Sequence, residues 1–378
     1  MGSVYVINLL VSFHYFLVIY INSNFLSQFL SRTEVGLLYV FGSLVSIGIF
    51  ITFTGFLKKF GNYRFTLALL VLEMLALLGL AFATTLSEAL VAFTVFIAVS
   101  PVIYLNLDVF LEHFIRSEKA TGSRRGLFLT MINIAQVVCP FIAGLLLGAD
   151  EFYKVYLVSL AFMLAALFVL VHSLRRFHDP RYLDFSSLAL FRRIIRSRVF
   201  LSAFSAQFLL RFFYAWMVIY MPLYLLDVVG FSLSEIGFAF TIMLVPFLLL
   251  EYPLGKLADT VMPERTMAIV GFVIMALAVA VVPFYATTSF IAWSALLFIT
   301  RIGASFAEVA SESYFFKHVD GELADTISFF RLGRPATYVV AAIIASVTLL
   351  VLPFGMSFLV LAAVMLLGIV AGLRLRTR

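Results

Sequence analysis

The segment EYPLGKLADTVMPERT, residues 251–266, places a glycine and a cluster of charged side chains between two long apolar runs. The segment TFTGFLKKFGNYRFT, residues 52–66, has the same setting in the first half of the chain, and Gly55 aligns with Gly255. Unrelated helices seldom keep such a register, so the sequence predicts two similar halves joined in one chain. Three further pairs align at the same shift, to within one position: residues 30–39 with 231–240, Asp108 with Glu308, and Glu112 with Glu312.

The composition excludes a water-soluble globule. Of the 378 residues, 63% are hydrophobic and 12% are charged, and the mean hydropathy is +1.11. Soluble proteins usually carry about a quarter charged residues, so this chain has too little polar surface to face water on all sides. The single cysteine, Cys139, excludes an internal disulfide and a cysteine-based metal cluster. We therefore expect a membrane protein without a metal or another cofactor.

Twelve apolar runs are long enough to cross a bilayer. The hydrocarbon core is about 30 Å thick and a helix rises about 1.5 Å per residue, so each span needs roughly 20 residues. The first run has no basic segment before it and no cleavage site behind it, which indicates a retained span and not a signal peptide. The runs lie near residues 4–24, 35–56, 65–85, 89–114, 127–148, 154–174, 199–226, 236–254, 266–286, 289–315, 327–350 and 356–373.

These runs predict an all-α, polytopic membrane protein with twelve transmembrane helices in two pseudo-symmetric six-helix bundles. We expect an N-terminal bundle over residues 1–174, a basic cytoplasmic linker over 175–198 and a C-terminal bundle over 199–378. Halves that repeat in the same orientation are related by an axis along the membrane normal. Their interface near the midplane is the usual place for a substrate.

The lysines and arginines of the loops indicate the orientation. If both termini face the cytoplasm, that side carries nearly all of these cations, and the opposite side carries only Arg32 and Lys154. The net charge of +6 is then a signal of topology and requires no nucleic-acid partner. The segment RRIIRSR, residues 192–198, is expected to anchor the linker at the membrane surface. We expect a monomer in the cell membrane, with a prokaryotic inner membrane as the favoured location.

With its twelve spans and internal repeat, the chain resembles the major facilitator superfamily over essentially its full length. Between the second and third helices of each half, that family has Gly-x-Leu-Ala-Asp followed by basic residues. GKLADTVMPER keeps this pattern at Gly255 and Asp259, whereas GFLKKFGNYR has Lys59 where the family has the aspartate. The segment EHFIRSEKATGSRRG, residues 112–126, is similar to the family's Glu and Arg-Gly pattern between the fourth and fifth helices.

The resemblance implies a cytoplasmic gate built from these loops. A glycine turn lets two helices approach, and a carboxylate beside a helix start meets its free N–H groups and its positive dipole end. After the turn at Gly255, Asp259 would face the start of the fifth span at Arg124. By symmetry Lys59 would approach Asp325 at the start of the eleventh span, so that a charge swap replaces the missing aspartate. Alternatively, the lysines anchor the loop to anionic lipid.

At least nine ionisable side chains lie inside the predicted spans. Each costs roughly 2.5 to 3.5 kcal/mol at the bilayer centre, so they must face one another or a hydrated cavity. Arg301, Glu308 and Glu312 are spaced as one stripe of the tenth span. By resemblance to the family, the first, fourth, seventh and tenth helices line the central cavity. The nine are Glu73, Asp108, Glu112, Arg211, Arg301, Glu308, Glu312, Arg331 and Arg334.

Two interpretations of these charges stay open. In the first, they form a buried network of ion pairs, in which Arg331 and Arg334 neutralise Glu308 and Glu312, and Arg125 neutralises Glu112. In the second, one or more carboxylates bind and release a proton, because dehydration favours the neutral acid and a nearby guanidinium favours the anion. The candidates for proton coupling are Asp108, which has no predicted cation neighbour, and then Glu112, Glu308 and Glu312.

The predicted substrate-binding stripe lies on the seventh span. Gln207, Arg211 and Tyr214 follow the spacing i, i+4 and i+7, and Arg301 would face them across the cavity. Guanidinium groups bind carboxylate or phosphate groups with two parallel hydrogen bonds. Alternatively, Arg211 neutralises a carboxylate of the protein.

On the first span, Tyr15 and Asn22 are expected to add polar lining to the cavity. His14 lies about 120° from them around a helix, at roughly 100° per residue. We therefore interpret it as a packing or lipid-facing residue and not as a coupling group. Glu73 has no assigned partner or role.

The sequence predicts a transporter and not an enzyme, because phosphate-binding loops, metal-binding pairs and long catalytic loops are absent from it. The first prediction is proton-coupled export of a small organic molecule by alternating access, with the solute, the proton and the bilayer as partners. The segment CPFIAG, residues 139–144, resembles part of a stretch found in the family's antiporters. One alternative is a proton symporter that imports an organic or inorganic anion. The other is a lipid flippase or a membrane component without a solute path.

Overall fold

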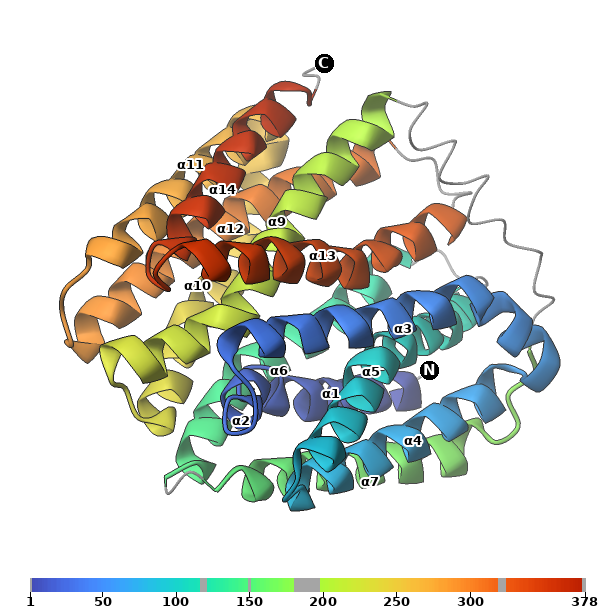
Figure 1. Cartoon of the computed structure of the whole chain (residues 1–378). Helices are drawn as coiled ribbons and strands as arrows, with labels where there is room; N and C mark the ends of the chain where they lie inside the picture. Colours follow the sequence, from blue (N-terminus) through green and yellow to red (C-terminus); the bar gives the residue numbers. More distant parts are fainter. Residues whose placement is uncertain (1, 116–120, 149–150, 180–197, 319–323, 376–378) are drawn as a thin grey trace.

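Every regular element of the described chain is helical. The computed structural model describes residues 2–115, 121–148, 151–179, 198–318 and 324–375, with side chains except at 115, 121–126, 198–200, 259, 316–318 and 324–332. The first half contains α1 Gly2–Val18, α2 Asn22–Leu26, α3 Arg32–Phe60, α4 Asn62–Phe82, α5 Leu86–Ile115, α6 Thr121–Leu146 and α7 Phe152–Leu174 (Figure 1). The second half contains α9 Arg198–Tyr224, the π-helical turn η1 Leu225–Val229, α10 Leu233–Thr260, α11 Glu264–Val281, the 3-10 turn η2 Val282–Phe284, α12 Phe290–His318, α13 Ala324–Val351 and α14 Ser357–Leu373.

Twelve of these helices are the predicted spans. Ten are long and apolar enough to cross a membrane by length and composition, and the two shorter apolar helices are α1 and α14. The predicted all-α fold with twelve transmembrane helices is therefore confirmed. The boundaries of the two bundles and of the linker stay a prediction, since residues 180–197 lie outside the description.

The internal repeat extends to the geometry of single hydrogen bonds. At the start of α3, the Ser31 hydroxyl accepts from the Glu34 N–H at 3.4 Å, and the Glu34 carboxylate accepts from the Ser31 N–H at 2.8 Å. At the start of α10, Ser232 and Glu235 form the same reciprocal pair at 3.3 and 2.8 Å. Such a capping box satisfies two N–H groups that a helix start leaves unpaired. The two segments aligned in the sequence thus begin equivalent helices.

The first span is not one continuous helix. α1 ends at Val18 and α2 begins at Asn22, so Asn22 does not continue the face on which Tyr15 lies. Asn22 is fully buried and its Oδ1 accepts from the Tyr156 hydroxyl at 2.9 Å, while Ser23 contacts the Tyr39 hydroxyl at 3.2 Å. Asparagine and serine are poor helix formers that compete with the backbone for hydrogen bonds. These bonds to other helices hold the end of the first span.

The two glycines of the repeated motif lie inside helices and do not form turns. α3 continues past Gly55 to Phe60 and α10 continues past Gly255 to Thr260, and a Cβ added at either glycine would meet no atom within 4 Å. The predicted glycine turn at these positions is therefore wrong. The turn between α3 and α4 is instead made by Gly61, whose φ of 75° is a conformation that other residues rarely adopt.

Each half packs around its own helices, and two helix pairs make most of the contacts between the halves. In the first half, α1 packs on α6 and α7, α4 packs on α5 and α7, and α3 packs on α5. In the second half, α9 contacts α12, α13 and α14, while α11 lies between α12 and α14. Between the halves, α3 runs beside α13, as Figure 1 shows, and α6 packs on α10.

Candidate functional site

The two halves contact each other closely at one end of the molecule. We call the end where α3 meets α4 and α10 meets α11 the linker end, and the end where α3 and α10 begin the opposite end. At the opposite end, Arg32 Nε donates to Asp227 Oδ2 at 2.9 Å, and its guanidinium lies 4.6 Å from the centre of the Phe354 ring. The Ser346 hydroxyl donates to the carbonyl of Thr33 at 3.3 Å. These contacts join α3 to η1 and α13.

The second pair of helices between the halves is closer still at the same end. A Cβ placed on Gly237 of α10 would lie 2.6 Å from the Pro140 carbonyl and 2.7 Å from the Gly144 Cα of α6. Both neighbours are backbone atoms that cannot rotate away. Only glycine allows α6 and α10 to pack at this distance, which closes the opposite end between the halves.

A cavity of about 320 Å³ lies between the two halves and is lined by both. Its lining comes from α1, α3, α5 and α6 of the first half and from α9, α10, α12 and α13 of the second. Side chains for recognising a polar solute are concentrated on the second half. They comprise three arginines, Arg211, Arg301 and Arg334, and three carboxylates, Glu251, Glu308 and Glu312.

Arg301 is the most deeply buried of these arginines, with 1% of its surface exposed. Its guanidinium carbon lies 5.1 Å from the centre of the Phe213 ring and 5.3 Å from that of Tyr214, so two aromatic rings of α9 support it. Among the residues whose side chains are described, its Nε and Nη1 have no hydrogen-bond partner. Buried N–H groups normally have a partner, so this arginine has donors to offer to a molecule in the cavity.

The other two arginines approach the same cavity from α9 and α13. The Arg334 guanidinium lies 5.2 Å from the centre of the Tyr15 ring, which belongs to α1 of the first half. Arg211 packs against α13, because a Cβ added at Gly333 would lie 3.4 Å from its Nη1. Cation–π contacts of this kind stabilise a desolvated guanidinium while its N–H edge stays available for hydrogen bonds.

Two of the three carboxylates accept hydrogen bonds from neutral side chains. The Tyr214 hydroxyl donates to Glu308 Oε2 at 2.8 Å, and the Asn133 amide donates to Glu251 Oε2 at 2.9 Å. The second bond joins α6 of the first half to α10 of the second. Beside them, Ser311 donates to Gln207 Oε1 at 3.4 Å. The cavity therefore presents fixed donors and acceptors from both halves.

Eight residues predicted from the sequence are brought together by this cavity. They are Tyr15, Gln207, Arg211, Tyr214, Arg301, Glu308, Glu312 and Arg334. Asn22 does not line it, because its side chain is buried against α7. Asp108 and Glu112 lie on α5 outside the lining, and Asp108 is 7% exposed. Their predicted role in proton coupling stays a prediction.

The predicted ion pairs and the predicted gate are described only in part. Glu308 accepts from Tyr214, whereas Arg334, its predicted partner, lies over Tyr15. Lys59 is exposed at the linker end, and its ammonium lies 5.2 Å from the centre of the Phe60 ring. The remaining predicted partners, Arg124, Arg125, Asp259, Asp325 and Arg331, lie outside the residues whose side chains are described.

Two carboxylates acquire roles that the sequence did not indicate. Glu251 begins the charged segment 251–266 and is not among the nine ionisable side chains assigned to the predicted spans, yet its side chain on α10 lines the cavity. Asp179, which follows α7, accepts from the N–H of Asn62 at 2.7 Å and contacts the turn at Gly61. The start of α4 thus receives a carboxylate although the loop itself carries Lys59. The signal for Glu251 was its place inside the predicted span 236–254, where it is one more ionisable side chain in an apolar run.

Comparison with known proteins gives the same fold. The model of the Major Facilitator Superfamily matches residues 4–243 and 203–378. Among solved structures, a POT family transporter in complex with 5-aminolevulinic acid is 14% identical with a TM-score of 0.79, over 98% of this chain and 94% of that chain. A mutant of the peptide transporter POT in complex with alafosfalin is 15% identical with a TM-score of 0.77, over 99% of this chain and 93% of that one. At such identities the likeness shows the fold alone.

No curated protein matches the sequence significantly. The family model, in contrast, covers nearly the whole chain in two overlapping parts, as two similar halves require. The chain therefore belongs to the major facilitator superfamily of membrane transporters.

Proposed function

We propose that this transporter carries a small organic anion together with a proton. The observation on which the proposal rests is Arg301, a buried guanidinium beside a cavity between the halves, with two N–H groups unpartnered among the described side chains. An anionic group of a solute would supply the missing acceptors and would offset the cost of a buried charge. Arg211 and Arg334 line the same cavity and add to its preference for anions.

The solved structures of similar fold support this substrate class. One POT family transporter holds 5-aminolevulinic acid, which carries a carboxyl group, and one peptide transporter POT holds sulfate, an anion. The aromatic walls of the present cavity, including Tyr15 and Phe247, favour a solute that also has an organic portion. This is the anion-binding alternative of the sequence analysis.

Coupling to a proton follows from charge. An anion that crosses alone moves its charge through the membrane potential, which is worth about 2.3 kcal/mol per 100 mV. A proton carried in the same direction cancels that charge. The carboxylates that line the cavity, Glu251, Glu308 and Glu312, are placed to exchange a proton near the solute. We therefore favour symport, with Asp108 and Glu112 as further candidates for the proton pathway.

The basic residues of the linker end support a cytoplasmic location for that end. Lys58, Lys59 and Arg64 lie there, whereas Arg32 and Lys154 lie at the opposite end. Both termini would then be cytoplasmic. The opposite end, closed by the contacts of Arg32 and Gly237, would face outward, and alternating access would consist of opening these contacts while the linker end closes.

The test is solute flux in proteoliposomes under an imposed pH gradient. The panel would contain small carboxylic acids, amino acids, short peptides and phosphonates, each paired with its uncharged amide or ester. We expect at least one anionic compound of the panel to accumulate on the side toward which protons flow. Its uncharged amide or ester should not accumulate. Solute movement against the proton flow would instead establish the export first predicted from the sequence.

Two further outcomes would contradict the proposal. Movement of labelled lipid without any solute flux would identify a flippase. Equal transport of a solute and its uncharged analogue would show that the arginines do not select the substrate. Liposomes carrying Arg301→Gln serve as the negative control, and Arg374→Gln, an exposed arginine after α14, serves as the matched control for loss of one positive charge.

A further inference from the structure

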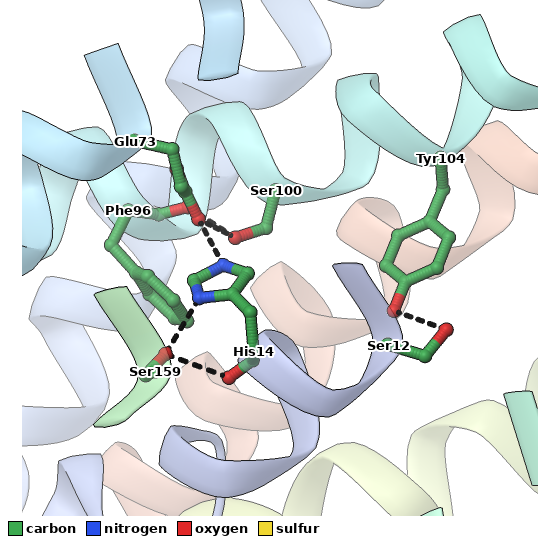
Figure 2. A network of polar contacts seen from close by, with 7 residues as sticks. All are labelled: Ser12, His14, Glu73, Phe96, Ser100, Tyr104 and Ser159. Atoms are coloured by element: carbon green, nitrogen blue, oxygen red, sulfur yellow. Dashed lines mark hydrogen bonds and ion pairs between the residues drawn. The ribbon is translucent and has the colours of Figure 1, made fainter. Parts of the chain in front are cut away.

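A second group of ionisable side chains is buried inside the first half, outside the lining of the central cavity. His14 of α1 lies between Glu73 of α4 and Ser159 of α7, and Ser100 of α5 reaches the same carboxylate (Figure 2). We call these four residues the His14 cluster. His14 is 1% exposed and Glu73 is 0% exposed, and Glu73 lies at the middle of a membrane-spanning helix. The cluster is not explained by solute binding.

The bonds on one side of the histidine fix one of its protons. The Ser159 hydroxyl donates to the backbone carbonyl of His14 at 3.1 Å, which uses its only hydrogen because a carbonyl can only accept. When Ser159 makes that bond, the contact of 2.7 Å between His14 Nδ1 and Ser159 Oγ is donated by the ring, and both contacts are hydrogen bonds. His14 therefore carries a proton on Nδ1 in this arrangement, and its Nε2 faces Glu73 Oε1 at 3.1 Å.

The hydrogen bonds of Glu73 and Ser100 can be satisfied with two different numbers of protons on the pair of His14 and Glu73. Ser100 has two acceptors within reach, Glu73 Oε1 and the Phe96 carbonyl at 2.9 Å, but only one hydrogen. If Ser100 donates to Glu73, the pair needs one proton, shared between His14 Nε2 and the carboxyl group. If Ser100 turns to the carbonyl, Glu73 itself can donate to the hydroxyl while a charged His14 donates to Glu73. Rotation of one hydroxyl thus keeps the contacts of Glu73 with both Ser100 and His14 in both states, and the bond from Ser100 to the Phe96 carbonyl is made only in the second.

We propose that the His14 cluster is a proton-binding site of the transport cycle, separate from the solute cavity. In the first state the pair is neutral overall, as a charged histidine with a carboxylate or as a neutral histidine with a carboxylic acid. In the second state it holds one more proton and has a net charge of +1. The bound proton comes from water and returns to water, and no other bond changes. The link to transport rests on the proposed proton coupling; the binding of the proton does not.

The groups that surround the cluster leave this charge uncompensated. Titratable neighbours in the described part of the chain are phenols and a thiol, which stay neutral: Tyr15 on α1, Tyr104 on α5 and Cys139 on α6. The charged groups that the neighbouring helices carry lie further along them, with Asp108 two turns beyond Ser100 on α5 and Lys154 more than one turn before Ser159 on α7. The nearest charge on the cavity side is Arg334, which contacts Tyr15. A second proton in the cluster therefore changes the local charge in full.

Helix α1 links the His14 cluster to the cavity, because neighbouring residues of this helix belong to each of them. His14 and Tyr15 are neighbours in the sequence, and both rings contact Phe96, at 5.8 and 6.3 Å between ring centres. On its other side Tyr15 lies under the guanidinium of Arg334. Figure 2 also shows Tyr104 of the cavity wall directed at Ser12, the residue two positions before His14. A change of charge at His14 therefore acts on the same helix that forms the wall of the solute site.

The direct test is infrared difference spectroscopy of the purified full-length protein across a pH range. We expect a carboxyl C=O band that appears as the pH falls and is absent in Glu73→Gln. The matched control is Glu88→Gln, a carboxylate at the exposed start of α5, which should leave that band unchanged. Because the pair gains one proton in total, nuclear magnetic resonance of the wild-type protein with labelled histidine should show His14, assigned by His14→Gln, gaining charge over the same range only to the extent that the proton does not bind the carboxylate.

A functional measurement separates coupling from a purely structural role. If wild type shows proton-driven flux, Glu73→Gln should lose accumulation of the solute under a pH gradient. The variant should keep solute exchange between compartments of equal pH. Equal loss of both would indicate a structural role and would overturn the link to transport. A wild-type protein in which neither Glu73 nor His14 changes protonation would overturn the site itself, even if the variants fail to fold. Absence of proton-linked flux in wild type would remove the proposed symport and leave the spectroscopic result to decide the site.

Discussion

Arg301 illustrates how one side chain can be both costly and useful in a membrane. An arginine near the centre of a span costs roughly 2.5 to 3.5 kcal/mol, and a desolvated cation–π contact returns up to about 2 kcal/mol. Phe213 and Tyr214 therefore offset much of the cost without using the N–H groups. The donors stay directed to the cavity. An arginine whose only purpose was structural would have its N–H groups paired with the protein.

The first prediction concerns the affinity of that arginine for an anion. Arg301→Gln should weaken binding of the transported anion by about tenfold to a hundredfold, because hydrogen bonds to charged groups contribute about 1.5–3 kcal/mol. Binding would be measured by isothermal titration with purified protein. Arg301→Lys should retain part of the affinity, since it keeps the charge but not the planar fork. An unchanged affinity in Arg301→Gln would exclude contact with the solute.

For single residues, the sequence predicted which side chains line the cavity, but it contained less information about which side chains they contact there. Spacing along single helices brought Gln207, Arg211 and Tyr214 to one cavity, because a helix fixes which residues share a face. The partners across the cavity depend on how helices rotate against each other, which spacing within one helix does not contain. Glu308 accepts from the Tyr214 hydroxyl of α9, and its predicted pairing with Arg331 and Arg334 of α13 stays a prediction.

Pairs of helices set the distance between the halves, and α6 and α10 bring their backbones close together at Gly237. Backbone atoms of Pro140 and Gly144 occupy the space where a side chain of Gly237 would start. The approach resembles small-residue packing elsewhere in membrane proteins, where backbones come close and gain van der Waals contact. It occurs at the opposite end and so supports closure there.

The second prediction follows from this contact. Gly237→Ala should push α10 away from α6 and lower the midpoint of thermal unfolding in detergent, because overpacking typically costs about 1–3 kcal/mol. The matched control is Gly48→Ala on α3, where a Cβ would meet nothing within 4 Å. That variant should keep or raise the midpoint, since alanine is the better helix former by about 1 kcal/mol. Equal effects of the two substitutions would argue against a tight contact.

The third prediction concerns the ion pair of α3 with η1. Arg32 and Asp227 are 41% and 29% exposed, so their attraction is expected to contribute about 0–1 kcal/mol. Asp227→Asn should therefore shift the population of the closed opposite end by at most about fivefold. Spin labels on either side of that end would report the shift as a distance distribution. Exchange of the two charges, Arg32→Asp with Asp227→Arg, should restore it, and a failure to do so would remove the pair from the gate.

Helix existence was readable from the sequence, but helix ends were not. Length and hydropathy located twelve spans, but α3 and α10 begin at Arg32 and Leu233, three residues before the predicted starts of these spans near residues 35 and 236. The first span broke near Asn22 because its polar side chains bond to neighbouring helices, and α10 ran through Pro253 to Thr260. Both deviations depend on contacts with other helices, and the helix preferences of the residues themselves do not predict such contacts.

For the molecule as a whole, the repeat in the sequence becomes a cavity between similar halves. Charges that no single helix could hold in lipid are gathered at this interface and in one cluster of the first half. In the proposed function the polar groups of the cavity recognise a solute, while the contacts of Arg32 and Gly237 join the two halves at one end. The internal repeat and the loop cations predicted this plan, because both reflect symmetry and topology directly. The full set of polar groups in the cavity could not be predicted from the sequence, because side chains of both halves line it.

The most direct measurement is protection of one cavity residue from a thiol reagent. Gln136 of α6 lines the cavity, so Gln136→Cys would be made in a Cys139→Ser background, with the buried native thiol removed. The account predicts that the transported anion slows labelling of this cysteine, that its uncharged analogue does not, and that Arg301→Gln abolishes the protection. Labelling at the same rate with and without a solute that the protein demonstrably transports would contradict a solute site in this cavity.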